Sequence, residues 1–188
     1  MKRLLRSKRG LGTPVANLIV LTAAVLLSVT VTAFAMNVTT SQVQKESLFI
    51  ATSHVWYTNS SYSVGAIAVT NIGPTDAVLN RITVKGLQCA WNGSDNFVVY
   101  CKINQSLPAD LMYVRTLTNG GNNTITVGNE PFVFTVAEEG LTLKSGWTIM
   151  FYVVIPDRIM VYDLGQPIRI VISTTQAVYC TETNVQAV

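Results

Sequence analysis

One uncharged segment, Leu11 to Met36, constrains this chain more than any other feature of its sequence. No charged residue occurs between Arg9 and Lys45. A run of this length suffices to cross the hydrocarbon core of a bilayer, and a helix that is apolar on all sides must be buried in a membrane or in a packed core. The segment therefore predicts an apolar helix that is surrounded by lipid or by other helices.

The charges of the chain are distributed unevenly around this segment. Five of the 13 basic residues precede Gly10, and the other eight are accompanied by ten acidic residues. The positive-inside rule then places Met1 in the cytoplasm and the bulk of the chain outside the membrane. Because the basic character belongs to the first ten residues, few residues remain to form a basic groove, and we expect no nucleic-acid partner.

Three kinds of N-terminal processing are compatible with this pattern. A secretory signal peptide would be cut after Ala33-Phe34-Ala35, ahead of Met36, and an uncut segment would remain as a membrane anchor. In the third, cleavage after Gly10 would remove the basic leader and leave Leu11 as the first mature residue. We favour the third, because the apolar run exceeds the roughly 7–15 residues of a signal-peptide core.

Cleavage between Gly10 and Leu11 resembles the processing of class III leaders by prepilin peptidases. The motif consists of Lys8-Arg9-Gly10, then Gly12-Thr13-Pro14 and the run Asn17-Leu18-Ile19-Val20-Leu21, and it is similar to the start of archaeal type IV pilins and the related archaellins. The resemblance covers about a quarter of the chain. Val15 stands where the mature helix of bacterial pilins carries a glutamate, so no role of that carboxylate is carried over.

The resemblance implies a protein of three parts. Residues 1–10 are a leader removed by prepilin peptidase, residues 11–46 a hydrophobic helix, and residues 47–188 a β-sandwich head. It implies that the chain is stored in the cytoplasmic membrane and assembles with copies of itself, through the pilus assembly machinery, into an extracellular filament on the cell surface. An adhesive pilus and a swimming archaellum both remain open; a loose match of residues 64–86 and 168–185 to archaeal pilin heads favours the pilus.

Beyond Glu46 the pattern changes from helical to strand-like. Segments rich in Val, Ile, Thr and aromatic residues are separated by turn sequences such as Asn71-Ile72-Gly73-Pro74. Their spacing predicts an immunoglobulin-like antiparallel β-sandwich, and with the helix an α+β fold. The expected strands are residues 47–57, 62–70, 78–87, 97–103, 111–117, 124–127, 131–136, 147–155, 168–173 and 177–185.

The head carries several N-glycosylation sequons. Four of the five in the chain fall at or beside predicted turns, where a glycosyltransferase can reach them. In an exported protein this arrangement predicts a glycan-coated outer face. The candidate asparagines are Asn37, Asn59, Asn92, Asn104 and Asn122.

The chain has three cysteines. An exported location permits a disulfide, and Cys89 with Cys101 would close the turn from Trp91 to Asn96 if the flanking strands bring them side by side. Cys180 is then either a small buried residue of the final strand or a partner for Cys89 or for another subunit.

The sequence lacks the motifs of common enzymes. His54 is the only histidine, which excludes a zinc site of several imidazoles, and there is no Cys-x-x-Cys pair, no Gly-x-Ser-x-Gly elbow and no phosphate-binding loop. Glu138-Glu139 is interpreted as a solvated turn. We expect no enzymatic activity, no cofactor and no metal.

The three tryptophans suggest a second function from a different class. Trp56, Trp91 and Trp147 could form a platform for stacking sugars, as in a secreted or anchored β-sandwich binding module. A sandwich of this size also needs large core side chains, so we favour burial of these rings in the core or between subunits. The preferred hypothesis is a structural filament subunit.

Overall fold

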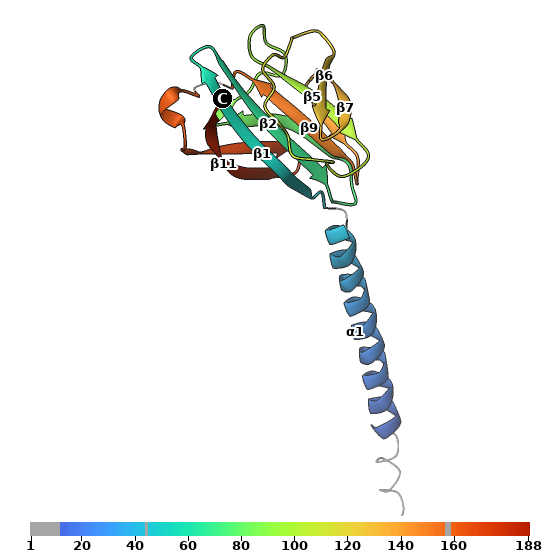
Figure 1. Ribbon diagram of the computed structural model, residues 1–188. Coiled ribbons are helices and arrows are strands. Elements are labelled where there is room, and N and C mark those ends of the chain that lie inside the picture. Colours follow the sequence, from blue (N-terminus) through green and yellow to red (C-terminus); the bar gives the residue numbers. More distant parts are fainter. Residues whose placement is uncertain (1–11, 44, 157–158) are drawn as a thin grey trace, which may run out of the picture. The chain divides into compact units, whose positions relative to one another are not determined.

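The computed structural model describes residues 12–43, 45–156 and 159–188. The chain divides into two units, Met1–Gln44 and Lys45–Val188, and we call the second the head. The first unit contains helix α1, Gly12–Val43, and the described part of the head contains eleven strands (Figure 1). The predicted α+β fold, a long N-terminal apolar helix followed by a large and mostly antiparallel β-sheet, is confirmed.

The first turn of helix α1 contains a proline, which is favourable at this position. Pro14 lies in the first turn, where a missing backbone N–H costs no hydrogen bond and the fixed φ of proline favours the helix. No glycine or proline follows before Val43, so nothing in the sequence interrupts the backbone ladder.

The strands of the head are β1 (Leu48–Asn59), β2 (Tyr62–Asn71), β3 (Ala77–Val84), β4 (Leu87–Gln88), β5 (Phe97–Ile103), β6 (Asn123–Val127), β7 (Glu130–Val136), β8 (Leu141–Leu143), β9 (Thr148–Val154), β10 (Pro167–Thr174) and β11 (Val178–Ala187), with a short 3-10 helix η1 (Val161–Asp163) before β10. Short loops connect most of these strands, and a longer loop connects β5 to β6.

Hydrogen bonding joins the strands in the order β4-β3-β10-β11-β1-β2-β9-β5-β7-β6, with β8 paired to β3. Strands β1, β2, β9 and β5 form a central sheet, which Figure 1 shows running side by side. A second sheet contains β3, β10 and β11. The two meet where β11 pairs with β1 in parallel, from Val55 opposite Val185 to Tyr57 opposite Ala187. This junction departs from the entirely antiparallel pairing expected from the sequence.

The inner strands of the central sheet, β2 and β9, are buried on both faces. One apolar cluster lies between the two sheets and includes Ile67 of β2 and Leu79 of β3. The other lies on the opposite face, where Ala66 of β2 and Tyr152 of β9 pack with Phe134 of β7. All seven residues of β9 are buried, which explains why this strand is a continuous apolar run and does not alternate. The head is therefore a sandwich with a third, partial layer.

Residues 104–122, which we call the covering loop, belong to that third layer. The prediction of a strand at 111–117 was wrong, because this stretch forms neither helix nor strand. Leu111 and Leu117 are buried against the central sheet, so their apolar character reflects packing and not strand pairing. The short strand β8 was not predicted.

The loop after β2 depends on a glycine. A Cβ atom on Gly73 would lie 2.5 Å from the backbone N of Ser47 and 3.2 Å from the carbonyl oxygen of Lys45. The Gly73 N–H also donates to the Ser47 carbonyl oxygen at 3.0 Å. Only a residue without a side chain allows the start of the head to pack this closely on the loop.

We predict that Gly73→Ala destabilises the head by about 1–3 kcal/mol, because the clash involves backbone atoms that cannot rotate away. Gly65→Ala is the matched control, since the nearest atom to its Cβ would be Val55 Cγ2 at 3.7 Å. Thermal unfolding followed by circular dichroism measures both. Equal melting temperatures for the two variants would contradict the prediction.

Candidate functional site

The surface of α1 from Gly12 to Thr40 is mostly apolar and is exposed. Each residue from Gly12 to Thr40 is exposed within the chain, and the helix has no acidic residue in its first turn and no basic residue in its last. By length and composition, Gly12–Thr40 could cross a membrane, a test that a signal sequence also passes. An exposed apolar surface of this extent marks a site of interaction with lipid or protein.

Five threonine hydroxyls of α1 are satisfied by backbone carbonyl oxygens of the helix. Thr22 Oγ1 donates to the Leu18 carbonyl oxygen at 3.0 Å and Thr32 Oγ1 to that of Ser28 at 2.8 Å. Thr30, Thr39 and Thr40 make equivalent bonds one turn back. A hydroxyl that is bonded to its own backbone can enter an apolar environment at little cost, so these threonines do not oppose burial of the helix.

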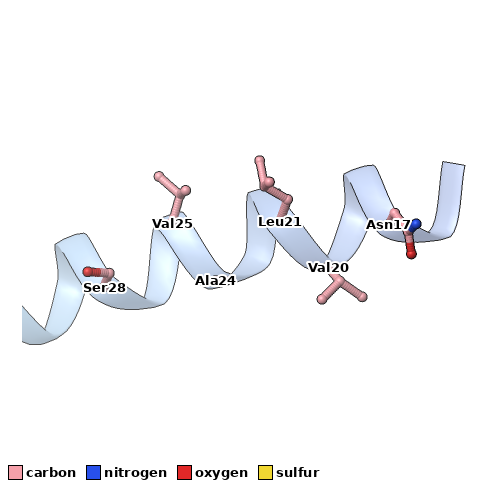
Figure 2. A pocket seen from close by; sticks show the side chains of 6 residues that line it. All are labelled: Asn17, Val20, Leu21, Ala24, Val25 and Ser28. Carbon is pink, nitrogen blue, oxygen red and sulfur yellow. The ribbon is translucent and has the colours of Figure 1, made fainter. Parts of the chain in front are cut away.

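One side of α1 is shallowly hollowed. Figure 2 shows the residues that line this hollow, which combine small side chains with larger ones: Asn17, Val20, Leu21, Ala24, Val25 and Ser28. The small side chains of Ala24 and Ser28 allow another backbone to approach closely. The Asn17 amide provides both donors and an acceptor for a neighbouring helix.

The structure places the predicted processing and glycosylation residues as follows. Gly10 and Leu11 lie outside the described residues. The asparagines of all five sequons are exposed: Asn37 on α1, Asn59 at the end of β1, Asn92 before β5, Asn104 after β5 and Asn122 before β6. The four in the head lie in or next to turns and loops, and their accessibility is compatible with modification.

The predicted Cys89–Cys101 disulfide is not formed. Cys89 belongs to the cluster between the two sheets, whereas Cys101 packs against the cluster on the other face of the central sheet. The bridge between Asn92 and Phe97 sets a register in which Tyr100, and not Cys101, would face Cys89. A shift of one residue reverses the face of a strand side chain, which separates the two thiols. Cys180 is exposed, so the first of its two alternatives, a small buried residue of the final strand, was wrong.

A polar cluster on the edge of the covering loop includes His54. The His54 Nε2 atom lies 2.9 Å from both carboxylate oxygens of Asp110 and 3.0 Å from Thr52 Oγ1, and the His54 ring stacks on Trp56. Burial acts to raise the pKa of Asp110, but hydrogen bonds from Thr52 and His54 outweigh it and hold that pKa below its ordinary value. The cluster fastens the covering loop to β1 through hydrogen bonds of Asp110 with His54 and Thr52.

The tryptophans do not form a common platform. Trp56 and Trp91 are both buried, and they lie in different clusters on opposite faces of the central sheet. Trp147 is half-buried, with Lys144 Nζ 5.5 Å from the centre of its ring. The burial favoured from the sequence is confirmed for the first two rings. Among the described residues no group of three or more His, Cys, Asp or Glu side chains could hold a metal ion.

An ion pair that the sequence did not indicate joins Lys85 to Asp163. The Lys85 Nζ atom lies 2.7 and 2.8 Å from the two carboxylate oxygens of the buried Asp163, which also accepts a hydrogen bond from the Met160 N–H. Lys85 has a φ of 52°, a rare value for a residue with a side chain. Since 78 residues separate the partners, no local pattern could have revealed the pair.

No model of a protein family matches this chain, and no curated protein matches it.

We predict a pH-dependent contribution from Asp163. Burial acts to raise its pKa, but Lys85 and the Met160 N–H outweigh it and hold the pKa below the ordinary value of about 3.9. The stabilisation is therefore present above that ordinary value and is lost as the pH falls through the lower, folded-state pKa. Asp163→Asn should lower the free energy of unfolding by about 2 kcal/mol at neutral pH and by progressively less in acid.

The exposed pair of Arg169 and Glu182, 3.3 Å apart, supplies the matched control. Glu182→Gln should change the free energy of unfolding by less than about 0.5 kcal/mol. Denaturant titrations of both variants between neutral pH and about pH 3 make the comparison. A pH-independent effect of Asp163→Asn would show that its ion pair does not stabilise the head.

Proposed function

We propose that this protein is a structural subunit of an extracellular filament similar to archaeal type IV pili. The observation that carries the proposal is α1, a 32-residue uncharged helix whose described side chains from Gly12 to Thr40 are all exposed within the chain. Such a surface requires lipid or other copies of the helix.

The head supports the proposal because its core does not draw on α1. Both apolar clusters consist of residues from Leu48 to Val185. Burying one large aliphatic side chain is worth about 1.5–3 kcal/mol, so the exposed valines and leucines of α1 represent a large unrealised stabilisation. That stabilisation is available to a membrane-stored subunit and again to a bundle of helices in a filament.

Identical subunits that associate through unlike surfaces, with a rotation that does not close, form an open helical filament. In this arrangement α1 occupies the filament core and the head forms the outer wall, where its exposed sequons would carry glycans. The preferred role is surface attachment by a pilus; an archaellum for swimming uses the same plan. The assembled function needs no active site, cofactor or metal.

The first residue of the mature protein tests this proposal. We expect intact-mass and peptide mass spectrometry of protein isolated from its native cells to identify Leu11, because cleavage after Gly10 retains the apolar helix. An N-terminus at Met36 would mean that the helix has been discarded, and it would overturn the filament proposal. Arg9→Ala, with Lys2→Ala as control, should block processing selectively if the motif before Gly10 is recognised.

A further inference from the structure

We infer that one end of the head docks on anionic lipid headgroups while the subunit is stored in the membrane. The inference rests on the proposed function, in which α1 spans the bilayer before assembly. It concerns a patch, which we call the basal patch, formed by Lys45, Ile72, Lys144 and Trp147. Lys45 is the first residue of the head, and backbone contacts hold the segments of the other three residues beside it.

Backbone hydrogen bonds hold the three segments of the basal patch together. The Asn71 N–H donates to the Trp147 carbonyl oxygen at 2.9 Å, and the Ile72 N–H donates to the Ser47 carbonyl oxygen at 2.9 Å. Gly146 N–H donates in turn to the Asn71 carbonyl oxygen at 2.8 Å. The close approach of Gly73 to Lys45 adds a further contact. The patch is thus a fixed part of the head.

The basal patch combines the residue types that favour a membrane interface. Lys45 and Lys144 are exposed, Ile72 has 63% of its surface exposed, and the half-buried Trp147 ring lies beneath the Lys144 ammonium group. Tryptophan is enriched where acyl chains meet headgroups, and lysine is attracted to anionic lipid. An exposed isoleucine beside them adds apolar surface for the same boundary.

Few acidic groups oppose this attraction among the described residues near the patch. Glu46 is buried and accepts a hydrogen bond from Thr174 Oγ1. Asp76 is exposed, and its carboxylate accepts a hydrogen bond from the Ser145 N–H at 3.1 Å. Among the exposed groups of the patch and its surroundings, the two lysines therefore outnumber the single carboxylate of Asp76.

The length of the connecting chain places the patch near the membrane in the stored state. Lys45 follows the end of the apolar span at Thr40 by five residues, of which three continue α1. At ~1.5 Å per helical residue and ~3.5 Å per extended residue, Lys45 lies at most ~12 Å from the hydrocarbon boundary. This distance is comparable to the headgroup layer plus one Debye length, so anionic lipid acts on Lys45 directly.

We expect Trp147 to contact lipid, and we expect more of this contact when the lipid is anionic. The full chain is reconstituted into vesicles of phosphatidylcholine alone or mixed with phosphatidylglycerol, each containing lipids brominated close to the headgroup. We expect bromine to quench tryptophan fluorescence more strongly in the anionic vesicles, and Trp147→Phe to remove that difference because Trp56 and Trp91 are buried.

Variants that remove one lysine charge distinguish electrostatic docking of the patch from simple closeness of the head to the bilayer. Lys45→Gln and Lys144→Gln should each lower the ratio of docked to undocked heads about fivefold in anionic vesicles. Arg115→Gln removes the same charge from an exposed position on the covering loop and should leave quenching unchanged. Equal quenching in both kinds of vesicle, or no effect of the lysine variants, would overturn the inference.

Flotation of the vesicles distinguishes failure of this inference from failure of the proposed function. A chain that does not float with vesicles has no membrane-stored state, which would contradict the function itself. A chain that floats without charge-dependent quenching would contradict only the docking of the basal patch. Protection of Trp147 in filaments but not in anionic vesicles would assign the patch to contacts between subunits and would also overturn the inference.

Discussion

The proposed storage and assembly of this protein both depend on the apolar surface of α1. Its described side chains from Gly12 to Thr40 are exposed within the chain, its threonine hydroxyls bond to its own backbone, and it has no charge to anchor it in water. A helix with these properties is stable in lipid and stable among similar helices. We propose that the protein uses both environments in succession, first for storage and then for assembly.

The head can remain folded through that transition because it is stabilised independently. The central sheet is covered on one face by the second sheet and on the other by β6, β7 and the covering loop. Side chains such as Phe151 and Tyr152 are fully buried on opposite faces of β9. A head of this kind tolerates a change in the surroundings of α1, and its exposed loops are available for glycans.

The sequence predicted the helix and most strands because each is a local pattern of hydrophobicity. It did not predict the covering loop. Leu111 and Leu117 are apolar because they pack on the central sheet, and this apolar pattern was wrongly assigned to a strand. The Cys89–Cys101 pairing failed because it depended on a register that local sequence does not specify. The ion pair of Lys85 and Asp163 could not be predicted from the sequence, because only the fold brings the two residues together. The predicted cleavage at Gly10 stays a prediction.

Placing one charge on α1 and observing assembly by electron microscopy tests whether this helix forms the filament core. Leu26→Asp should abolish filaments on cells, because an unpaired carboxylate within packed helices costs several kcal/mol, while the head of the variant melts as in the parent protein. Leu26→Met should preserve filaments, and so should Thr126→Asp, which adds the same charge to an exposed position of β6. Normal filaments from Leu26→Asp would show that α1 is not the core of the assembly.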